Sequence, residues 1–189
     1  MITFSFDIGL KNLAVCVFDT KNEILEWKLI DLTRKEKKKV DLVTVGRNLK
    51  EEIDVLIASV LLMRLQKGGT NNPFLVLLEN QIAPKASNMK SIQCMLMQYF
   101  IDKTEAEIKF VSSKLKSSLF TLSTSTLTSS SSTSTTLNYS QRKRKAVEIC
   151  EEMTKDTCWN HLFTSKKNKK DDLADCYLQG VAYMEKYGN

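Results

Sequence analysis

Apolar residues near the N-terminus form three short blocks that are separated by turn-forming residues. The blocks cover residues 2–6, 13–18 and 24–32. Gly, Asn and Asp gather in the two segments between them, residues 8–12 and 19–22, where these residue types favour tight turns. The pattern predicts three strands that are joined as consecutive antiparallel hairpins.

Farther along the chain, helical periodicity alternates with short apolar runs. From residue 41 to about 65, apolar side chains recur at every third or fourth position, which is typical of an amphipathic helix. A second helical stretch covers residues 89–101. The runs 74–78 and 108–111 predict strands, and the first of them is continuously apolar, which favours a buried central strand. This order predicts an α/β fold around one sheet.

The composition changes abruptly after the last of these strands. Between residues 112 and 136, 18 of 25 residues are Ser or Thr. Such a segment has too little apolar surface to order itself, so we interpret residues 112–137 as a flexible linker or a partly ordered surface insertion. A tether without chemistry of its own is the favoured interpretation. Helices are predicted to follow at 139–153 and 172–186. The length fits one domain, residues 1–189.

The charge of the chain is unevenly distributed. The 189 residues include 28 Lys and Arg and 22 Asp and Glu, which gives a net charge of +6. Residues 34–39, 142–145 and 166–170 together hold 13 basic residues and one acidic residue. These segments carry +12, so the remaining chain carries −6. Concentrated cationic patches favour a polyanionic partner such as nucleic acid.

Several function classes lack their sequence signatures. The five cysteines form no CxxC pair, which is typical of reduced intracellular thiols. No apolar run approaches the ~18 residues of a membrane span, and no secretory or transit peptide is evident, so we expect a cytoplasmic protein without membrane association. His161 is the only histidine of the chain, and together with Cys158 it provides at most two zinc ligands. The absence of GxGxxG and P-loop motifs argues against a nucleotide cofactor.

Four carboxylates stand at the ends of predicted elements. Asp7 follows the first strand and Glu79 follows the fourth. Asp172 and Asp175 lie three residues apart at the start of the last helix, so they share one face of it. If the first and fourth strands are neighbours, their carboxyl ends place Asp7 beside Glu79. The last helix can then bring its two carboxylates over them.

A converging carboxylate cluster requires a cation. Two carboxylates ~4 Å apart repel by about 4 kcal/mol at an effective dielectric constant near 20. Ligation by oxygen alone selects Mg²⁺ or Mn²⁺ over zinc. Two such ions can activate a water molecule and stabilise the leaving oxygen of a phosphodiester. The cluster therefore predicts a two-metal nuclease that uses Mg²⁺, with Mn²⁺ as a substitute.

Some of these acids also have purely structural interpretations. Asp7 suits a hairpin turn. Asp171 and Asp172 suit an N-cap and a first helical turn, where the dipole favours a carboxylate, and we prefer this interpretation for Asp171 alone. Glu79 follows five apolar residues, so its carboxylate needs a partner next to a buried strand. Asp175 lies one turn inside the last helix between Ala174 and Cys176, which makes it harder to explain as a surface charge. The metal-site hypothesis depends on the combination.

Three segments that carry these carboxylates resemble the acidic motifs of RuvC-type Holliday junction resolvases, in particular the poxvirus and fungal mitochondrial branch. They are residues 5–14 (SFDIGLKNLA), 78–81 (LENQ) and 169–175 (KKDDLAD). The resemblance extends from residue 2 to about 179, apart from the Ser/Thr-rich segment. It implies an RNase H-like α/β fold, with a mixed five-stranded sheet flanked by helices, in a viral protein of the host cytoplasm.

The resemblance also implies a homodimer that resolves four-way DNA junctions by Mg²⁺-dependent symmetric nicking. The catalytic, metal-binding carboxylates that it implies are Asp7, Glu79, Asp172 and Asp175, and the role of Asp171 is left open. A catalytic lysine is implied in a basic helix before the last motif, and we assign it to Lys145, with Lys143 as the alternative. The residues expected to bind DNA are Lys11, Arg142, Lys143, Arg144, Lys169 and Lys170.

Three other functions stay open at this point. An RNase H-like nuclease could act on another branched DNA or on RNA. Sugar kinases and actin-like ATPases share the D-I-G opening, although 189 residues leave no room for their duplicated domain. A non-catalytic nucleic-acid-binding module is the third alternative, and the presence of all four carboxylates argues against it.

Overall fold

The fold is seen in a computed structural model of the chain. The described residues are 1–36, 41–66, 68, 73–81, 87–116, 118–119, 138–165 and 169–188. Three features predicted from the sequence therefore lie partly outside them. These parts are residues 37–39 of the first basic segment, 166–168 of the last one, and 117 and 120–137 of the Ser/Thr-rich segment.

The described strands form one mixed sheet in the order β3-β2-β1-β4-β5. Their bounds are Ile2–Asp7 (β1), Leu13–Phe18 (β2), Ile24–Ile30 (β3), Phe74–Glu79 (β4) and Glu107–Val111 (β5). The first three strands pair antiparallel, whereas β1 pairs parallel with β4 and β4 pairs parallel with β5. The predicted hairpins, the five-stranded mixed sheet and the neighbouring first and fourth strands are confirmed.

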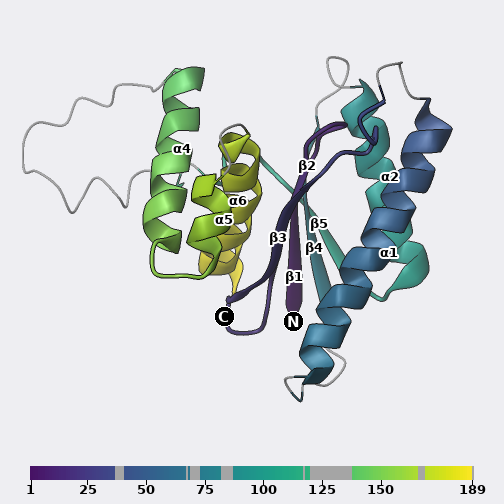
Figure 1. Cartoon of the computed structure of the whole chain (residues 1–189), viewed down its shortest axis with the longest axis horizontal. Coiled ribbons are helices and arrows are strands. Elements are labelled where there is room, and N and C mark those ends of the chain that lie inside the picture. The colour runs from purple at the N-terminus through teal and green to yellow at the C-terminus, as the bar shows by residue number, and fades with distance from the viewer. Residues whose placement is uncertain are drawn as a thin grey trace, which may run out of the picture.

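Helices cover both faces of this sheet, as Figure 1 shows. One face carries α1 (Leu42–Gln66) and α2 (Ser87–Lys103). The other carries α4 (Tyr139–Thr154), α5 (Trp159–Ser165) and α6 (Lys170–Tyr187). The α5 helix was not predicted, because seven residues are too few to show helical periodicity.

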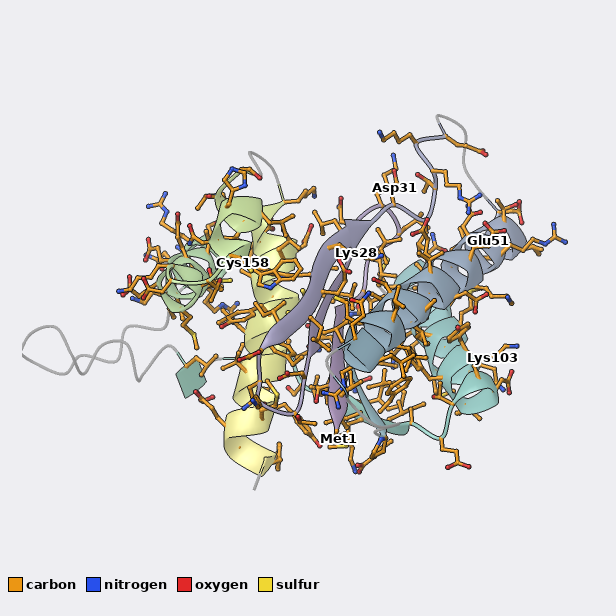
Figure 2. The ribbon with its side chains drawn as sticks, turned by 60° about the horizontal axis from the view of Figure 1, so that its bottom comes forward. Met1, Lys28, Asp31, Glu51, Lys103 and Cys158 are labelled. Atoms are coloured by element: carbon orange, nitrogen blue, oxygen red, sulfur yellow. The ribbon has the colours of Figure 1, made fainter. Side chains whose placement is uncertain are left out.

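Side chains fill the space on each side of the sheet (Figure 2). Beneath α1 and α2, the core includes Phe4 and Phe6 of β1, which pack around Phe100 with ring centroids 5.5 and 5.9 Å away. Beneath α4, α5 and α6, Trp27 stacks on Phe163 at 5.2 Å. Because the central strands β2, β1 and β4 are buried on both faces, they read as nearly continuous apolar runs.

A buried glutamine fixes α6 against the two central strands. Gln179 Nε2 donates to Ser5 Oγ and to the Phe6 carbonyl oxygen, both at 3.1 Å. It also lies 3.5 Å from the Leu77 carbonyl oxygen of β4. A buried polar side chain is retained at such a place only when its hydrogen bonds are made. This contact sets the position of the helix turn that carries Asp175.

The α6 helix also approaches β2 closely at Gly180. A Cβ atom there would lie 2.4 Å from Cε2 of Phe18, a ring that is buried in the core. We expect Gly180→Ala to destabilise the fold by about 1–3 kcal/mol through overpacking, which lowers the melting temperature by about 2–10 °C in a domain of this size. Thermal unfolding measures the effect.

Gly46→Ala is the matched control for this prediction. Gly46 lies inside α1, and a Cβ atom there would meet only Met95 at ordinary contact distances of 3.5 Å and above. Ala is favoured over Gly inside a helix by about 1 kcal/mol, so this variant is expected to melt at the same temperature or higher. Equal melting of Gly180→Ala and the wild type would contradict the packing of α6 on Phe18.

Candidate active site

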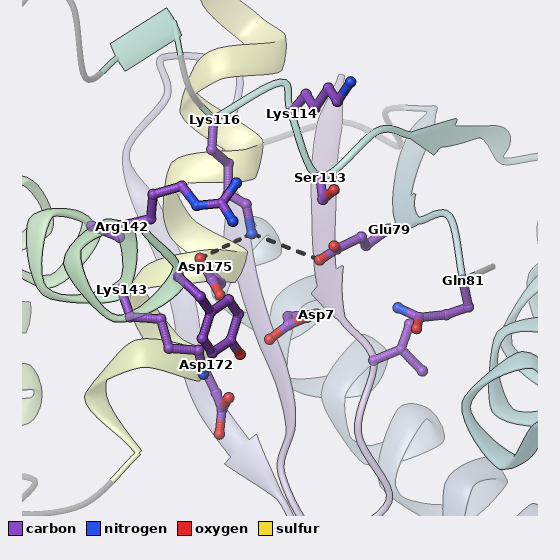
Figure 3. Close-up of a pocket in the computed structure, with 13 residues that line it drawn as sticks. Asp7, Glu79, Gln81, Ser113, Lys114, Lys116, Arg142, Lys143, Asp172 and Asp175 are labelled. Carbon is purple, nitrogen blue, oxygen red and sulfur yellow. Dashed lines mark ion pairs between the residues drawn. The ribbon is translucent and has the colours of Figure 1, made fainter. Parts of the chain in front are cut away.

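Two parallel strands place the first two carboxylates at the same edge of the sheet. Phe6 of β1 is in register with Leu78 of β4, so the residues that follow, Asp7 and Glu79, lie side by side. The α6 helix adds Asp172 and Asp175 from above. All four side chains line one pocket of about 450 Å³ (Figure 3). The structure therefore brings the predicted carboxylates together, and their catalytic and metal-binding roles remain predictions.

The pocket disfavours negative charge on two of these acids. Burial raises the pKa of Asp7 well above its usual value of 3.8, and the nearby charges of Glu79, Asp175 and Asp172 raise it further. Burial, followed by the charge of Asp171, also raises the pKa of Asp172. Oδ2 of Asp172 is buried and has no hydrogen-bond partner among the described residues. This oxygen is available to a cation.

Lys116 supplies a positive charge within the cluster, and sequence reasoning missed it. Its Nζ atom lies 2.9 Å from Oδ1 of Asp175 and 3.7 Å from Oε2 of Glu79, as the dashed lines in Figure 3 show. The residue is only 7% exposed. Burial alone would lower its pKa, but Asp175 and Glu79 raise it above the usual value. Lys116 is therefore a buried, charged residue of the site.

The beginning of residues 112–137 packs against the rest of the protein and contributes Lys116 to the pocket. Residues 112–116 follow β5 directly, and Leu119 is buried in the core beneath α6. Compositional bias hid this, because the first third of the segment contains Leu115, Leu119 and two lysines among its serines. Apolar residues four positions apart were the available signal that this part packs against the protein.

The basic helix α4 presents one face to the pocket. Tyr139, Arg142, Lys143 and Ala146 line it, and these positions share one face of a helix. Lys145 is not among the described residues that line the pocket. Of the two lysines considered for the catalytic role, Lys143 lines the pocket, whereas Lys145, to which we assigned that role, does not.

Lys143 is held in place by two neighbours. Its ammonium group pairs with Oδ2 of Asp171 and lies 5.3 Å from the centroid of the Tyr139 ring. Burial alone would raise the pKa of Asp171, but the hydrogen bond and charge of Lys143 keep it below the usual value. Asp171 therefore has a cationic partner in Lys143, and it is not among the described residues that line the pocket.

The other four residues expected to bind DNA are not among the described residues that line this pocket. Lys169 Nζ is 3.9 Å from Oδ2 of Asp172. When the Asn12 amide is oriented so that its nitrogen donates to the Lys11 carbonyl oxygen, its oxygen accepts from Lys169 Nζ at 3.2 Å. The ammonium group of Lys170 lies 5.3 Å from the Phe163 ring centroid. Lys11 and Arg144 are exposed. Of these four, only Lys169 contacts one of the pocket carboxylates.

The donor atoms suit a hard divalent cation. The pocket offers carboxylate oxygens, the ligands that Mg²⁺ and Mn²⁺ prefer, and one of them is the buried Oδ2 of Asp172, which has no hydrogen-bond partner among the described residues. In this arrangement, however, no three His, Cys, Asp or Glu side chains of the described residues lie close enough to hold one ion. The Lys116 ammonium lies between Glu79 and Asp175 instead.

Comparison with known proteins places the chain in a family. The model of the poxvirus A22 protein family matches residues 1–186. A curated relative is the Holliday junction resolvase of fowlpox virus (strain NVSL), which is 26% identical over 186 residues, covering 98% of this chain and 93% of the relative.

Solved structures of resolvases share the fold. The fowlpox virus Holliday junction resolvase superposes with a TM-score of 0.61 at 19% identity over 98% of this chain and 99% of that one. The same resolvase in complex with its Holliday junction DNA superposes with a TM-score of 0.63 at 18% identity over the full length of both chains. RuvC of T. thermophilus, in complex with a Holliday junction substrate, superposes with a TM-score of 0.58 at 9% identity, covering 99% of this chain and 96% of that one. The expected RNase H-like α/β fold of the RuvC type is confirmed, and because the family model spans nearly the whole sequence, the chain belongs to the poxvirus A22 protein family.

Proposed function

We propose that this protein is a Holliday junction resolvase, an endonuclease that cuts four-way DNA junctions in a reaction that requires Mg²⁺. The observation that carries the proposal is the pocket at the ends of β1 and β4, where Asp7, Glu79, Asp172 and Asp175 meet on a resolvase fold. The family membership and the fowlpox relative, which is a Holliday junction resolvase, support the same activity.

The carboxylates of the pocket are proposed to bind metal, and its basic residues are proposed to bind a DNA phosphate. The four carboxylates are the proposed ligands of two Mg²⁺ ions, which, when bound, supply a polarised water and neutralise charge on the scissile phosphate. Arg142 and Lys143 line the same pocket, where their positive charges can hold and orient a DNA phosphate. The ammonium group of Lys116 pairs with Oδ1 of Asp175 in the same pocket.

The charge of the pocket argues against a non-catalytic DNA-binding module. Four carboxylates lining one pocket would repel a phosphate backbone, so a surface that only binds DNA gains nothing from them. They become useful when cations convert the pocket into a place that attracts phosphate. A nuclease explains both the carboxylates and the basic residues around them.

A substrate comparison tests the proposal. The purified protein is incubated in Mg²⁺ with each of four substrates in separate reactions. The substrates are a four-way DNA junction, a flap, a linear duplex and an RNA of the same sequence. We expect cleavage of the junction to exceed cleavage of the linear duplex and RNA by at least ~100-fold. Equal cleavage of all four would identify a general RNase H-like nuclease, and preferential cleavage of RNA would reject the resolvase.

We further propose that the protein works as a homodimer in the host cytoplasm. A four-way junction needs two nicks, and each chain carries one pocket of this kind among its described residues. The exposed residues Val55, Leu62 and Leu65 give α1 apolar surface that a second copy could cover. Light scattering of the purified protein measures its mass.

Among the helices of the described ranges, none has the length and hydropathy of a membrane span.

The basic face of α4 predicts a change in salt dependence. Replacing Arg142 and Lys143 together by Ala should weaken junction binding and reduce the slope of log K against log [salt] by about one unit for each lost phosphate contact. Lys103→Ala is the control, because this residue lies at the end of α2 and does not line the pocket. Binding titrations between about 50 and 200 mM salt give the slopes, and an unchanged slope in the double variant would remove α4 from the DNA interface.

A further inference from the structure

Lys116 connects carboxylates that come from two different elements of the fold. It reaches the carboxylates from the segment after β5 and pairs with acids from two other elements, Glu79 at the end of β4 and Asp175 in α6. Its side chain is 9% exposed, and those of the two acids are 17% and 24% exposed. These three charged groups are thus largely withdrawn from water, where charge pairs are strong and unpaired charges are costly.

The other cations near the pocket do not have this position. The ammonium group of Lys143 pairs with Asp171, outside the set of four carboxylates, and that of Lys169 lies 3.9 Å from Asp172. Among the ion pairs of the described residues, only those of Lys116 join two of the proposed metal ligands. The same ammonium lowers the pKa of Asp7, opposing the neighbouring carboxylates. Lys116 therefore balances charge at the centre of the cluster.

We propose that Lys116 is an internal counter-ion that takes the place of a divalent cation in the metal-free protein and must leave Glu79 and Asp175 when metal binds. This inference rests on the proposed function, because it assumes that the four carboxylates bind metal. Metal binding is then an exchange of one cation for another.

The exchange has two measurable consequences. Without Lys116, the buried carboxylates lose their counter-ion, so the metal-free protein should be less stable. The incoming ion no longer has to displace an ammonium group, so the metal should bind more tightly. A lysine that only orients a ligand or contacts substrate would give the opposite result for metal affinity, or no change.

Lys116→Met and Lys114→Met form the test pair. Both variants remove one positive charge from the same pocket lining, but Lys114 makes none of the ion pairs with Glu79 and Asp175. Calorimetric titration of the metal-free proteins with Mg²⁺, in the absence of DNA, gives the affinities. We expect Lys116→Met to bind Mg²⁺ about tenfold more tightly than the wild type, and Lys114→Met to stay within about twofold of it, because an exposed charge is screened by solvent.

The possible outcomes separate this inference from the nuclease proposal. If the wild type binds Mg²⁺ and Lys116→Met binds it no more tightly than Lys114→Met does, the counter-ion role is overturned and the metal site stands. If none of the proteins binds Mg²⁺, the metal site itself is overturned, and the inference with it. If Lys116→Met is unfolded without metal, refolding on addition of Mg²⁺ supports the exchange, and failure to refold at saturating Mg²⁺ overturns it.

Discussion

Replacing Asp7 by Asn is expected to abolish nicking of a four-way junction while leaving junction binding within a few-fold of the wild type. Asp7 ends β1 beside Glu79, with Asp172 and Asp175 lining the same pocket. Asn keeps the size of the side chain but removes a charge that a divalent cation needs. A ligated metal contributes several kcal/mol to transition-state stabilisation, so its loss should reduce the rate by at least about a thousandfold.

Binding should survive this substitution, because DNA affinity comes mainly from phosphate contacts by basic residues. Nicking is measured under single-turnover conditions with Mg²⁺, and binding is measured on the same junction by fluorescence anisotropy in Ca²⁺-free EDTA buffer. Asp102→Asn is the control, since Asp102 is exposed near the end of α2 and does not line the pocket. A rate near that of the wild type in Asp7→Asn would rule out Asp7 as a metal ligand.

The same substitution is expected to stabilise the metal-free protein at pH 7. Burial is the main cause of the raised pKa of Asp7, and the charge of Glu79 adds to it. A carboxyl group whose pKa is raised on folding holds its proton more tightly in the folded state. Its contribution to stability is therefore lost as the pH rises from the unfolded value of 3.8 through the folded pKa. Asn carries no such charge.

Thermal unfolding in EDTA measures this effect. At pH 7 the variant Asp7→Asn should melt at least about 2 °C above the wild type, the shift that ~1 kcal/mol produces in a domain of this size. The difference should shrink as the pH is lowered towards 3.8, because the wild-type carboxyl group then becomes neutral. A lower melting temperature of the variant at pH 7 would show that the ionised Asp7 is stabilised by contacts that outweigh its burial.

Together, these two results would show that Asp7 lowers the stability of the metal-free protein and is nevertheless required for nicking. A pocket that gathers carboxylates is costly to fold without a cation, and the ion pairs of Lys116 with Glu79 and Asp175 offset part of that cost. Divalent cations should therefore stabilise the wild type more than they stabilise Asp7→Asn. The positions that destabilise the metal-free fold are then the ones that the reaction requires.

The sheet and the carboxylate pocket could be predicted because both depend on local pattern and strand order. Asp7 and Glu79 each end an apolar strand, and two parallel neighbours must present their carboxyl ends at one edge. The contribution of the last helix could also be predicted, because Asp172 and Asp175 lie three residues apart and therefore share one face of it. Short-range periodicity and the rules of strand pairing contain this information.

Lys116 could not be predicted in this way. Its role depends on how a segment rich in Ser packs against the core through residues such as Leu119, and composition alone suggested an unordered segment. The choice between Lys143 and Lys145 likewise depends on the rotation of α4 about its axis. Burial of Ala146, Ile149 and Cys150 fixes that rotation, and it directs Lys143 towards the pocket.

Nicking of a synthetic four-way junction, labelled on each strand in turn and incubated with the protein in Mg²⁺ or in EDTA, tests the central claim most directly. Our account predicts paired nicks at symmetric positions in two opposing strands with Mg²⁺, and no nicks in EDTA. Cleavage that persists in EDTA, or a folded protein that leaves the junction intact in Mg²⁺, would contradict it.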